Sequence, residues 1–213
     1  MGDINERLLV QIGSYNTNLQ TGAGLPQDLV DWLAPTLQVS SFLSKEQRAP
    51  DIVAIGFQEL LPLHLGRTYP VLHRCKDGPD DRPTTNTVAG RSKAVIDERD
   101  VHIRTQIEAH SKESYSLIAK AVNVGVALLV YAKDDAIARR VCDVQTQWTG
   151  SGPAYMGNKG AVGIRFRVTD HGSKAGEVFT LVCSYFFFPG LTQAFAVLSV
   201  HISQLTRHTS NVG

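Results

Sequence analysis

The sequence has little of what marks a secreted or nucleic-acid-binding protein. Cysteine is scarce, and the three that occur, Cys75, Cys142 and Cys183, are widely spaced, with no CxxC pair and no Cys/His pairing. Such a pattern predicts neither a disulfide framework nor a zinc site. With 21 Lys and Arg against 20 Asp and Glu, the formal net charge is only +1, so no global basic field attracts DNA, RNA or acidic lipid. Any anion must therefore be bound by a local cluster of donors.

The chain also has little that resembles a targeting or spanning segment. Met1 to Glu6 contains no basic region followed by an apolar stretch, so we expect no signal peptide. The most apolar stretch, Tyr185 to Ile202, is interrupted by Pro189 and Gly190 and carries several polar side chains, which makes it a poor spanning helix. We therefore expect a cytoplasmic protein.

Most of the predicted elements are β-strands. Two apolar runs near the start of the chain end abruptly in polar residues, which is typical of buried strands with functional groups at their tips. Period-2 alternation from Val162 to Val168 indicates a half-buried strand, which we join to a following strand as an antiparallel hairpin. The predicted strands are residues 8–14, 51–59, 115–122, 124–131, 141–147 and the hairpin 160–183.

Helices and loops complete the predicted organisation. We expect a helix over residues 26–33, where Pro26 suits a first turn, and a charged helix with a thin apolar face over residues 95–113. Residues 64–91 are rich in Pro, Gly, Asp and Thr and have no period, which predicts a surface insertion, and residues 149–153 form a loop. Helices that cover hairpin-joined strands predict an α/β sandwich rather than a strictly alternating parallel sheet.

The glycine-rich segment from Gly152 to Gly160 admits two interpretations. It nearly matches a nucleotide-binding P-loop, but Asn158 stands where that motif needs Lys, and a period-2 strand follows where it needs a helix. Alternatively, the glycines let the backbone approach an anion while Asn158 and Lys159 present an amide and a cation to a phosphate. On this segment alone, a glycine-rich hairpin with a solvated lysine is the simpler interpretation.

Strand ends supply the other candidate functional residues. Gln58 and Glu59 end one apolar run, and Asn16 follows another. A glutamate in that position is more often solvated than bound to a metal, and the asparagine alone is a weaker candidate still. Their interpretation therefore depends on the rest of the chain.

Four motifs, in order, resemble the inositol polyphosphate 5-phosphatase family of the endonuclease/exonuclease/phosphatase superfamily. The motifs are Ser14 to Asn18, Pro50 to Leu60, Val124 to Val130, and Thr149-Gly150 followed by Gly157 to Val162. The resemblance implies an α/β fold, a four-layer sandwich of the endonuclease/exonuclease/phosphatase type that is here incomplete. Residues 1–184 would be the N-terminal portion of its catalytic domain.

The resemblance implies a Mg²⁺-dependent hydrolase that removes the 5-phosphate from phosphoinositides or soluble inositol polyphosphates. Glu59 would hold Mg²⁺, Asn16 would help to place the metal or the scissile phosphate, and Asn158 and Lys159 would contact substrate phosphates. Mg²⁺ prefers hard oxygen ligands and keeps several waters, which suits one carboxylate, one amide and a substrate phosphate. Peripheral contact with the cytosolic face of a membrane follows from the substrate class alone.

The sequence departs from the family after Ser184. The family continues with a histidine that stabilises the phosphate, whereas this chain has Tyr185, and residues 185–213 match none of the later family motifs, Gly-Asp-Leu-Asn, Trp-Cys-Asp-Arg and Ser-Asp-His. We therefore expect a truncated domain with a divergent tail over residues 185–213. His201 and His208 are not taken as replacements, because a lone His in a mixed apolar stretch is usually structural or exposed.

Three functions stay open on the sequence. The first is a 5-phosphatase, with the activity of this particular chain undecided, and the second is a non-catalytic domain that binds inositol lipids or a protein partner. The third is a nuclease of the same superfamily, against which the near-neutral charge and the Gly157 to Gly160 loop argue. We expect no nucleic-acid partner, and the sequence does not determine the oligomeric state.

Overall fold

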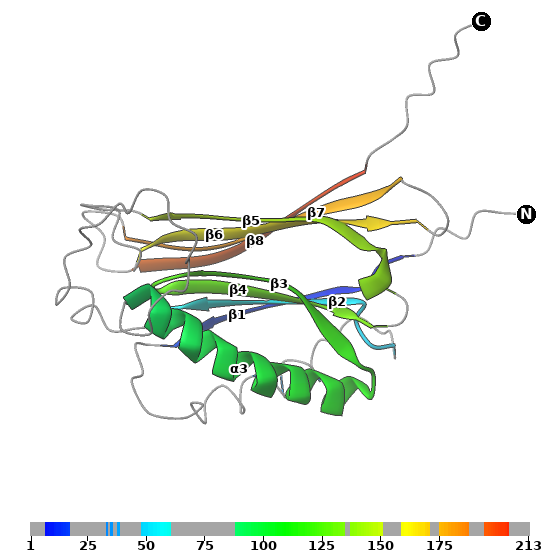
Figure 1. The fold of residues 1–213 in the computed structure, drawn as a ribbon, viewed down its shortest axis with the longest axis horizontal. Coiled ribbons are helices and arrows are strands. Elements are labelled where there is room, and N and C mark those ends of the chain that lie inside the picture. Colours follow the sequence, from blue (N-terminus) through cyan, green and yellow to red (C-terminus); the bar gives the residue numbers. More distant parts are fainter. Residues whose placement is uncertain are drawn as a thin grey trace, which may run out of the picture.

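Two four-stranded sheets lie face to face, and one helix covers the outer face of the first sheet (Figure 1). The computed structural model describes residues 7–17, 33, 35, 38, 48–60, 88–134, 137–150, 159–170, 175–187 and 194–204. The first sheet has the order β1-β2-β4-β3, with β1 at Val10–Asn16, β2 at Ile52–Gln58, β3 at Tyr115–Asn123 and β4 at Val126–Lys133. The second has the order β5-β6-β7-β8, with β5 at Val141–Gly150, β6 at Gly160–Thr169, β7 at Gly176–Phe187 and β8 at Ala194–Gln204.

Helix α3 and a short turn join these strands. α3, at Val88–Ser111, lies against the first sheet on the side away from the second sheet (Figure 1). The turn η1, at Ala138–Arg140, connects β4 to β5 across the two sheets. In the part of the chain that the structure describes, no helix combines the length and the apolar composition needed to cross a bilayer.

The central strands β2 and β4 contribute to two separate cores because successive side chains of a strand point to opposite faces. One set packs between the two sheets, and the other packs between the first sheet and α3. The β2 and β4 residues between the sheets are Ile52, Ala54, Val126, Leu128, Val130 and Ala132. Those facing α3 are Val53, Ile55, Phe57, Ala127, Leu129 and Tyr131. All seven residues of β2 are buried, which explains its uninterrupted apolar sequence.

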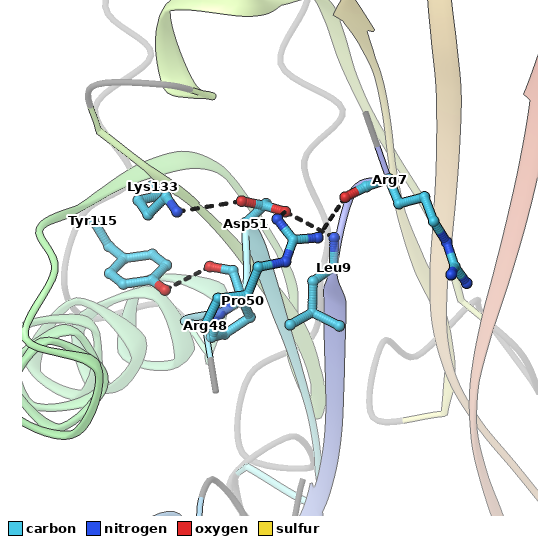
Figure 2. Close-up of polar contacts among 7 residues, drawn as sticks. All are labelled: Arg7, Leu9, Arg48, Pro50, Asp51, Tyr115 and Lys133. Atoms are coloured by element: carbon cyan, nitrogen blue, oxygen red, sulfur yellow. Dashed lines mark hydrogen bonds and ion pairs between the residues drawn. The ribbon is translucent and has the colours of Figure 1, made fainter. Parts of the chain in front are cut away.

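Asp51 connects three strands at the end of the first sheet where β2 begins (Figure 2). Its Oδ2 accepts a hydrogen bond of 2.8 Å from the Leu9 amide and lies 3.0 Å from Arg48 Nη1, and its Oδ1 lies 3.4 Å from Lys133 Nζ. The Asp51 amide in turn donates to the Leu9 carbonyl at 2.8 Å. Since Asp51 is only 3% exposed, these contacts compensate the desolvation of its carboxylate and align β1, β2 and β4.

The structure agrees with the predicted α/β fold and contains each predicted strand, whereas β8 was not predicted. β6 and β7 are antiparallel, as expected for the predicted hairpin, and β3 and β4 are also antiparallel, whereas β1 and β2 are parallel. The mixed first sheet agrees with the expectation that this is not a strictly alternating parallel sheet. The helix predicted over residues 26–33 lies almost entirely outside the described residues.

Among the predicted boundaries that differ from the structure, two concern residues that were assigned to another kind of element. The helix expected over residues 95–113 begins earlier, at Val88, so residues 88–91 belong to it rather than to the surface insertion. Thr149 and Gly150, expected in a loop, are the last residues of β5, because they pair with Ala161 and Gly160 at the start of β6. At Gly150, pairing with β6 extends the strand past the point where local composition suggested its end.

Candidate functional site

The carboxyl ends of β1 and β2 bring two candidate residues to one end of the sandwich. The two strands are parallel, and Asn16 lies opposite Gln58, so Glu59 follows at the same sheet end. Asn16 is exposed and Glu59 is partly exposed. An amide and a carboxylate, 43 positions apart by their numbers in the sequence, are thus neighbours because parallel strands end together.

Glu59 has a backbone conformation that is uncommon for a residue with a side chain. Its φ of 55° lies in the left-handed region, which is strained outside glycine and persists only where the surroundings hold it. Thr17 Oγ1 donates to the carbonyls of Gln58 at 3.1 Å and Glu59 at 2.5 Å, and the Leu60 amide donates to the Gly125 carbonyl at 3.3 Å. The chain therefore turns sharply after β2, and this turn holds the base of the Glu59 side chain in place.

Tyr185 joins Glu59 to Lys159. Its side chain comes from β7 into the core between the sheets and is only 4% exposed. Its hydroxyl donates a hydrogen bond to Glu59 Oε1, and Lys159 Nζ lies 3.6 Å from the centroid of its ring, a cation–π geometry. The strand register explains the second contact, because Gly160 lies opposite Tyr185 and Lys159 directly precedes Gly160.

Burial disfavours the charged forms of Lys159 and Tyr185. It lowers the pKa of the Lys159 ammonium from its ordinary value, an effect that the Glu59 carboxylate opposes. Burial raises the pKa of the Tyr185 hydroxyl, and the hydrogen bond to Glu59 and the charge of that carboxylate raise it further. Tyr185 is therefore a neutral hydrogen-bond donor around neutral pH.

Gln58 and Cys183 connect the two sheets beside this group. Gln58 is fully buried, and its Nε2 donates to Ser14 Oγ and to Cys183 Sγ, each at 3.0 Å. The Cys183 thiol donates to the Phe57 carbonyl at 3.7 Å. Because Cys183 and Tyr185 are two positions apart in β7, they face the same side, and this network supports the strand that carries Tyr185.

Lys159 is placed by a close approach of β5 and β6. Gly160 has a φ of 150°, and a Cβ atom built on it would lie 2.1 Å from the Thr149 carbonyl oxygen, closer than any side chain allows. Asn123 Nδ2 donates to the same carbonyl at 3.3 Å, which links the end of β3 to the end of β5. A glycine at position 160 is thus required where the backbone presents Lys159 to Tyr185.

The oxygen donors at this end of the sandwich fit a hard cation. Glu59 offers a carboxylate, and Asn16 offers an amide oxygen. Among the described residues there is no group of three or more His, Cys, Asp or Glu that could hold a metal ion. Mg²⁺ suits such a site because it keeps several waters and is usually bound through one or two carboxylates and substrate phosphates.

The structure brings together residues that were predicted from separate motifs. Glu59 and Lys159 both contact Tyr185, and Asn16 lies opposite the residue that precedes Glu59. Asn158 lies outside the described residues. The sequence signalled Tyr185 only as the residue in place of a family histidine, and its partners could not be inferred because 126 positions separate it from Glu59.

Comparisons with known proteins identify a family and several relatives of this chain. The profile of Endonuclease/Exonuclease/phosphatase family 2 matches residues 13–185. Synaptojanin-1 of Rattus norvegicus is 31% identical over 191 residues, which cover 85% of this chain and 10% of that protein. Type I inositol polyphosphate 5-phosphatase 8 of Arabidopsis thaliana is 29% identical over 157 residues, which cover 64% of this chain and 30% of that protein. Type II inositol 1,4,5-trisphosphate 5-phosphatase of Mus musculus is 28% identical over 158 residues, which cover 74% of this chain and 12% of that protein.

Among solved structures, the chain is similar to a mutant of Cimex nitrophorin in its ferrous NO complex. The TM-score is 0.43 and the identity 14%, over 82% of this chain and 45% of that chain. A likeness this low bears on neither the fold nor the function.

The family match covers the candidate site residues. It extends from Gly13 in β1 to Tyr185 in β7 and so contains Asn16, Glu59 and Lys159. The chain spans about a tenth of the length of its synaptojanin relatives. The profile match and the relatives confirm the resemblance seen in the four motifs, and the chain belongs to endonuclease/exonuclease/phosphatase family 2, with inositol polyphosphate 5-phosphatases and synaptojanins among its relatives.

Proposed function

We propose that this chain is part of a Mg²⁺-dependent phosphatase that removes the 5-phosphate of phosphoinositides or inositol polyphosphates. The observation that carries the proposal is the convergence of Glu59 and Lys159 on Tyr185. A carboxylate able to hold a metal beside a cation able to bind phosphate is the pair of groups that hydrolysis of a phosphate ester needs. The names of two relatives, an inositol polyphosphate 5-phosphatase and an inositol 1,4,5-trisphosphate 5-phosphatase, support this substrate class.

Each residue has a separate role in the proposal. The Glu59 carboxylate and the Asn16 amide oxygen hold the metal, and Asn16 also helps to place the scissile phosphate. Lys159 and Asn158 donate hydrogen bonds to substrate phosphates. Bound Mg²⁺ would supply positive charge that offsets the charge developing on the phosphoryl oxygens. Partial burial strengthens the attraction between the Lys159 ammonium and a phosphate, because water screens it less.

Phosphate release tests the proposal directly. The purified chain is incubated with Mg²⁺ and either inositol 1,4,5-trisphosphate or vesicles that contain a 5-phosphorylated phosphoinositide. We expect Glu59→Gln and Lys159→Met each to lower turnover by about 10²–10³-fold, the usual cost of removing one group that stabilises transition-state charge. The two substrates together separate a preference for lipid from a preference for soluble inositol phosphates.

Matched variants on the other side of the first sheet are the control. Glu98→Gln and Lys120→Met change the same residue types on α3 and β3, where Glu98 is exposed and Lys120 pairs with the exposed Asp97. Turnover should stay at the level of the unmodified chain in both. The proposal is wrong if the site variants and these controls reduce turnover equally, or if folded protein releases no phosphate from either substrate.

A non-catalytic domain that binds inositol lipids or a protein partner is the alternative. The observation that favours it is Tyr185, which stands where the family resemblance leads us to expect a phosphate-stabilising histidine. Under this alternative, inositol 1,4,5-trisphosphate binds, Lys159→Met weakens the binding, and no phosphate is released. Isothermal titration beside the turnover assay distinguishes the two functions.

We further propose that a second helical layer completes a four-layer sandwich. Val178 and Ser184 alternate with the core residues of β7 and so point away from the first sheet, yet they are only 3% and 9% exposed. Arg165 of β6, on the same face, is exposed, so the proposal rests on the fold that the family resemblance implies, and the layer would cover this part of the sheet. An experimental structure in which this face is open to solvent would contradict that arrangement.

Location and partners follow from the proposed substrate. We propose a cytoplasmic protein with peripheral contact to the cytosolic face of membranes and with no nucleic-acid partner. Sedimentation with phosphoinositide vesicles tests the first point, and a DNA cleavage assay tests the second. Cleavage of DNA without hydrolysis of inositol phosphates would favour a nuclease instead.

A further inference from the structure

Tyr185 is the point where the proposed metal ligand and the proposed phosphate-binding cation meet. Its hydroxyl donates to one oxygen of Glu59, and its ring lies 3.6 Å from Lys159 Nζ. Glu59 directly follows β2, Lys159 directly precedes β6, and Tyr185 is in β7. A single side chain thus contacts both charged groups of the site from between the two sheets.

The geometry leaves Glu59 able to bind a cation. The hydroxyl of Tyr185 bonds to Oε1, and a carboxylate has a second oxygen with its own lone pairs. Carboxylates that bind metals are commonly hydrogen-bonded through their other oxygen, and such bonds orient them. Because the backbone of Glu59 is already held by Thr17, this hydrogen bond restrains the part of the residue that is otherwise free to rotate.

Tyr185 itself is well restrained. It is 4% exposed, and it packs in the core between the sheets together with Cys183. In β7, Tyr185 pairs with Gly160 on one side and with Ala196 of β8 on the other. A ring held in this way gives its hydroxyl a defined position, which a solvated side chain would not have.

We propose that Tyr185 is a positioning residue of the site, whose hydroxyl orients the Glu59 carboxylate for a divalent cation and whose ring holds the Lys159 ammonium for a phosphate. The proposal rests on the proposed function for its metal and its substrate class. It assigns the hydroxyl of Tyr185 to the binding of a cation and the ring of Tyr185 to the binding of a phosphate. The hydroxyl and the ring can therefore be tested separately.

Two substitutions separate these halves in the full chain. Tyr185→Phe removes the hydroxyl and keeps the ring, so Mn²⁺ binding, followed by the paramagnetic resonance signal of the free ion, should weaken by about 10–100-fold. Binding of inositol 1,4,5-trisphosphate without metal should stay unchanged in this variant. Tyr185→Leu removes both halves, and we expect it to weaken trisphosphate binding several-fold as well, since the cation–π contact is lost.

Tyr131→Phe is the matched control. Tyr131 also donates its hydroxyl to a carboxylate, Asp100 Oδ1 at 2.8 Å, but it lies in the core between the first sheet and α3. This variant should lose stability in thermal unfolding while its Mn²⁺ affinity stays unchanged. Equal weakening of Mn²⁺ binding in Tyr131→Phe and Tyr185→Phe would overturn the proposal, because both effects would then reflect general destabilisation.

The remaining outcomes distinguish this inference from the proposed function. Mn²⁺ binding that Tyr185→Phe leaves unchanged, or tightens, overturns the role of Tyr185 and leaves the metal site standing. No Mn²⁺ binding by the unmodified chain overturns the metal site and this inference together. If a variant does not fold, the unmodified chain gives a second measurement: Mg²⁺ should shift the NMR resonances of the Tyr185 ring but not those of Tyr131, and no shift at Tyr185 overturns the proposal.

Discussion

At the scale of single residues, burial and close contacts shift the pKa values of Tyr115 and Arg99 in the described part. The Tyr115 hydroxyl donates to the Pro50 carbonyl at 2.6 Å (Figure 2), and burial raises the pKa of that hydroxyl. Arg99 is only 4% exposed, and its guanidinium lies 5.6 Å from the centroid of the Phe57 ring. Burial lowers the pKa of Arg99, whereas nearby Tyr15 and Glu98 raise it.

Cys183 should be unreactive in the folded protein. Burial raises the pKa of its thiol to about 11, and the thiolate is the nucleophile. Iodoacetamide at about pH 8 should therefore modify the partly exposed Cys142 first and Cys183 only after unfolding, as peptide mass spectrometry can show. Equal rates at the two cysteines in folded protein would contradict the burial of Cys183.

The same pKa shift makes a prediction about stability and pH. Because folding favours the neutral thiol, the contribution of Cys183 is fully present below its ordinary pKa of 9.0 and is lost as the pH rises toward about 11. Urea unfolding over this pH range should show a smaller loss of stability in Cys183→Ala than in the unmodified chain. Parallel losses in the two proteins would show that Cys183 does not contribute.

At the scale of elements, strand ends are placed by close backbone contacts and by single buried side chains. The hairpin of β6 and β7 begins with Gly160, where β5 leaves no space for a Cβ atom, whereas Gly163, three positions along β6, has ordinary contacts of 3.6 Å or more. At the end of the first sheet where β2 begins, Asp51 joins the starts of β1 and β2 to the end of β4. The first contact fixes a strand end at the candidate site, and the second fixes the end of the first sheet away from it.

Gly160→Ala should damage both stability and the site. The added methyl group meets the Thr149 carbonyl at 2.1 Å, so we expect a loss of about 1–3 kcal/mol in the free energy of unfolding and weaker phosphate binding, since Lys159 moves with the backbone. Gly163→Ala is the control, and it should change both quantities little. Denaturant unfolding and titration with inositol 1,4,5-trisphosphate measure them, and equal effects of the two substitutions would contradict the clash.

Asp51→Ala should destabilise the first sheet. The substitution leaves the Leu9 amide and two cations without their shared acceptor, so we expect a loss of about 1–3 kcal/mol. Asp97→Ala is the matched control, because the pair of Asp97 with Lys120 is more exposed and should contribute less than about 1 kcal/mol. Urea unfolding compares them, and similar losses would show that the buried network adds nothing.

At the scale of the whole molecule, two cores share the strands β2 and β4. One core lies between the sheets and the other lies beneath α3. The first sheet is therefore buried on both faces at its centre, whereas β5 pairs with β6 alone in the described part and exposes most of its residues, including Trp148 at 61%. Stability should accordingly be concentrated in the centre of the first sheet.

Hydrogen exchange should follow this distribution. Amides of β2 and β4 should exchange most slowly because opening them disrupts both cores, and amides on the free edge of β5 should exchange fastest among the strands. Exchange measured by mass spectrometry at neutral pH checks the order. Protection of β5 equal to that of β2 would indicate that another surface covers this edge.

The sequence predicted where helices and strands lie in the chain better than it predicted which of them lie side by side in the fold. Period-2 alternation and apolar runs located seven of the eight described strands, because these signals depend only on residues close in the chain, and only β8 was missed. The boundaries at Val88 and Gly150 were wrong, and at Gly150 the pairing of β5 with β6 extends the strand beyond its local signal. The division between a domain portion at residues 1–184 and a tail at residues 185–213 stays a prediction, although β7 and β8 pair across it.

By itself, the sequence determined the family, the α/β class, and Asn16, Glu59, Asn158 and Lys159 as the candidate site residues. Motif order and local periodicity suffice for these, because they are properties of short segments. Only the tertiary structure decided that Tyr185 lies between Glu59 and Lys159. That contact depends on how the two sheets stack and on the register of β6 against β7, and neither is encoded in the spacing of residues along the chain.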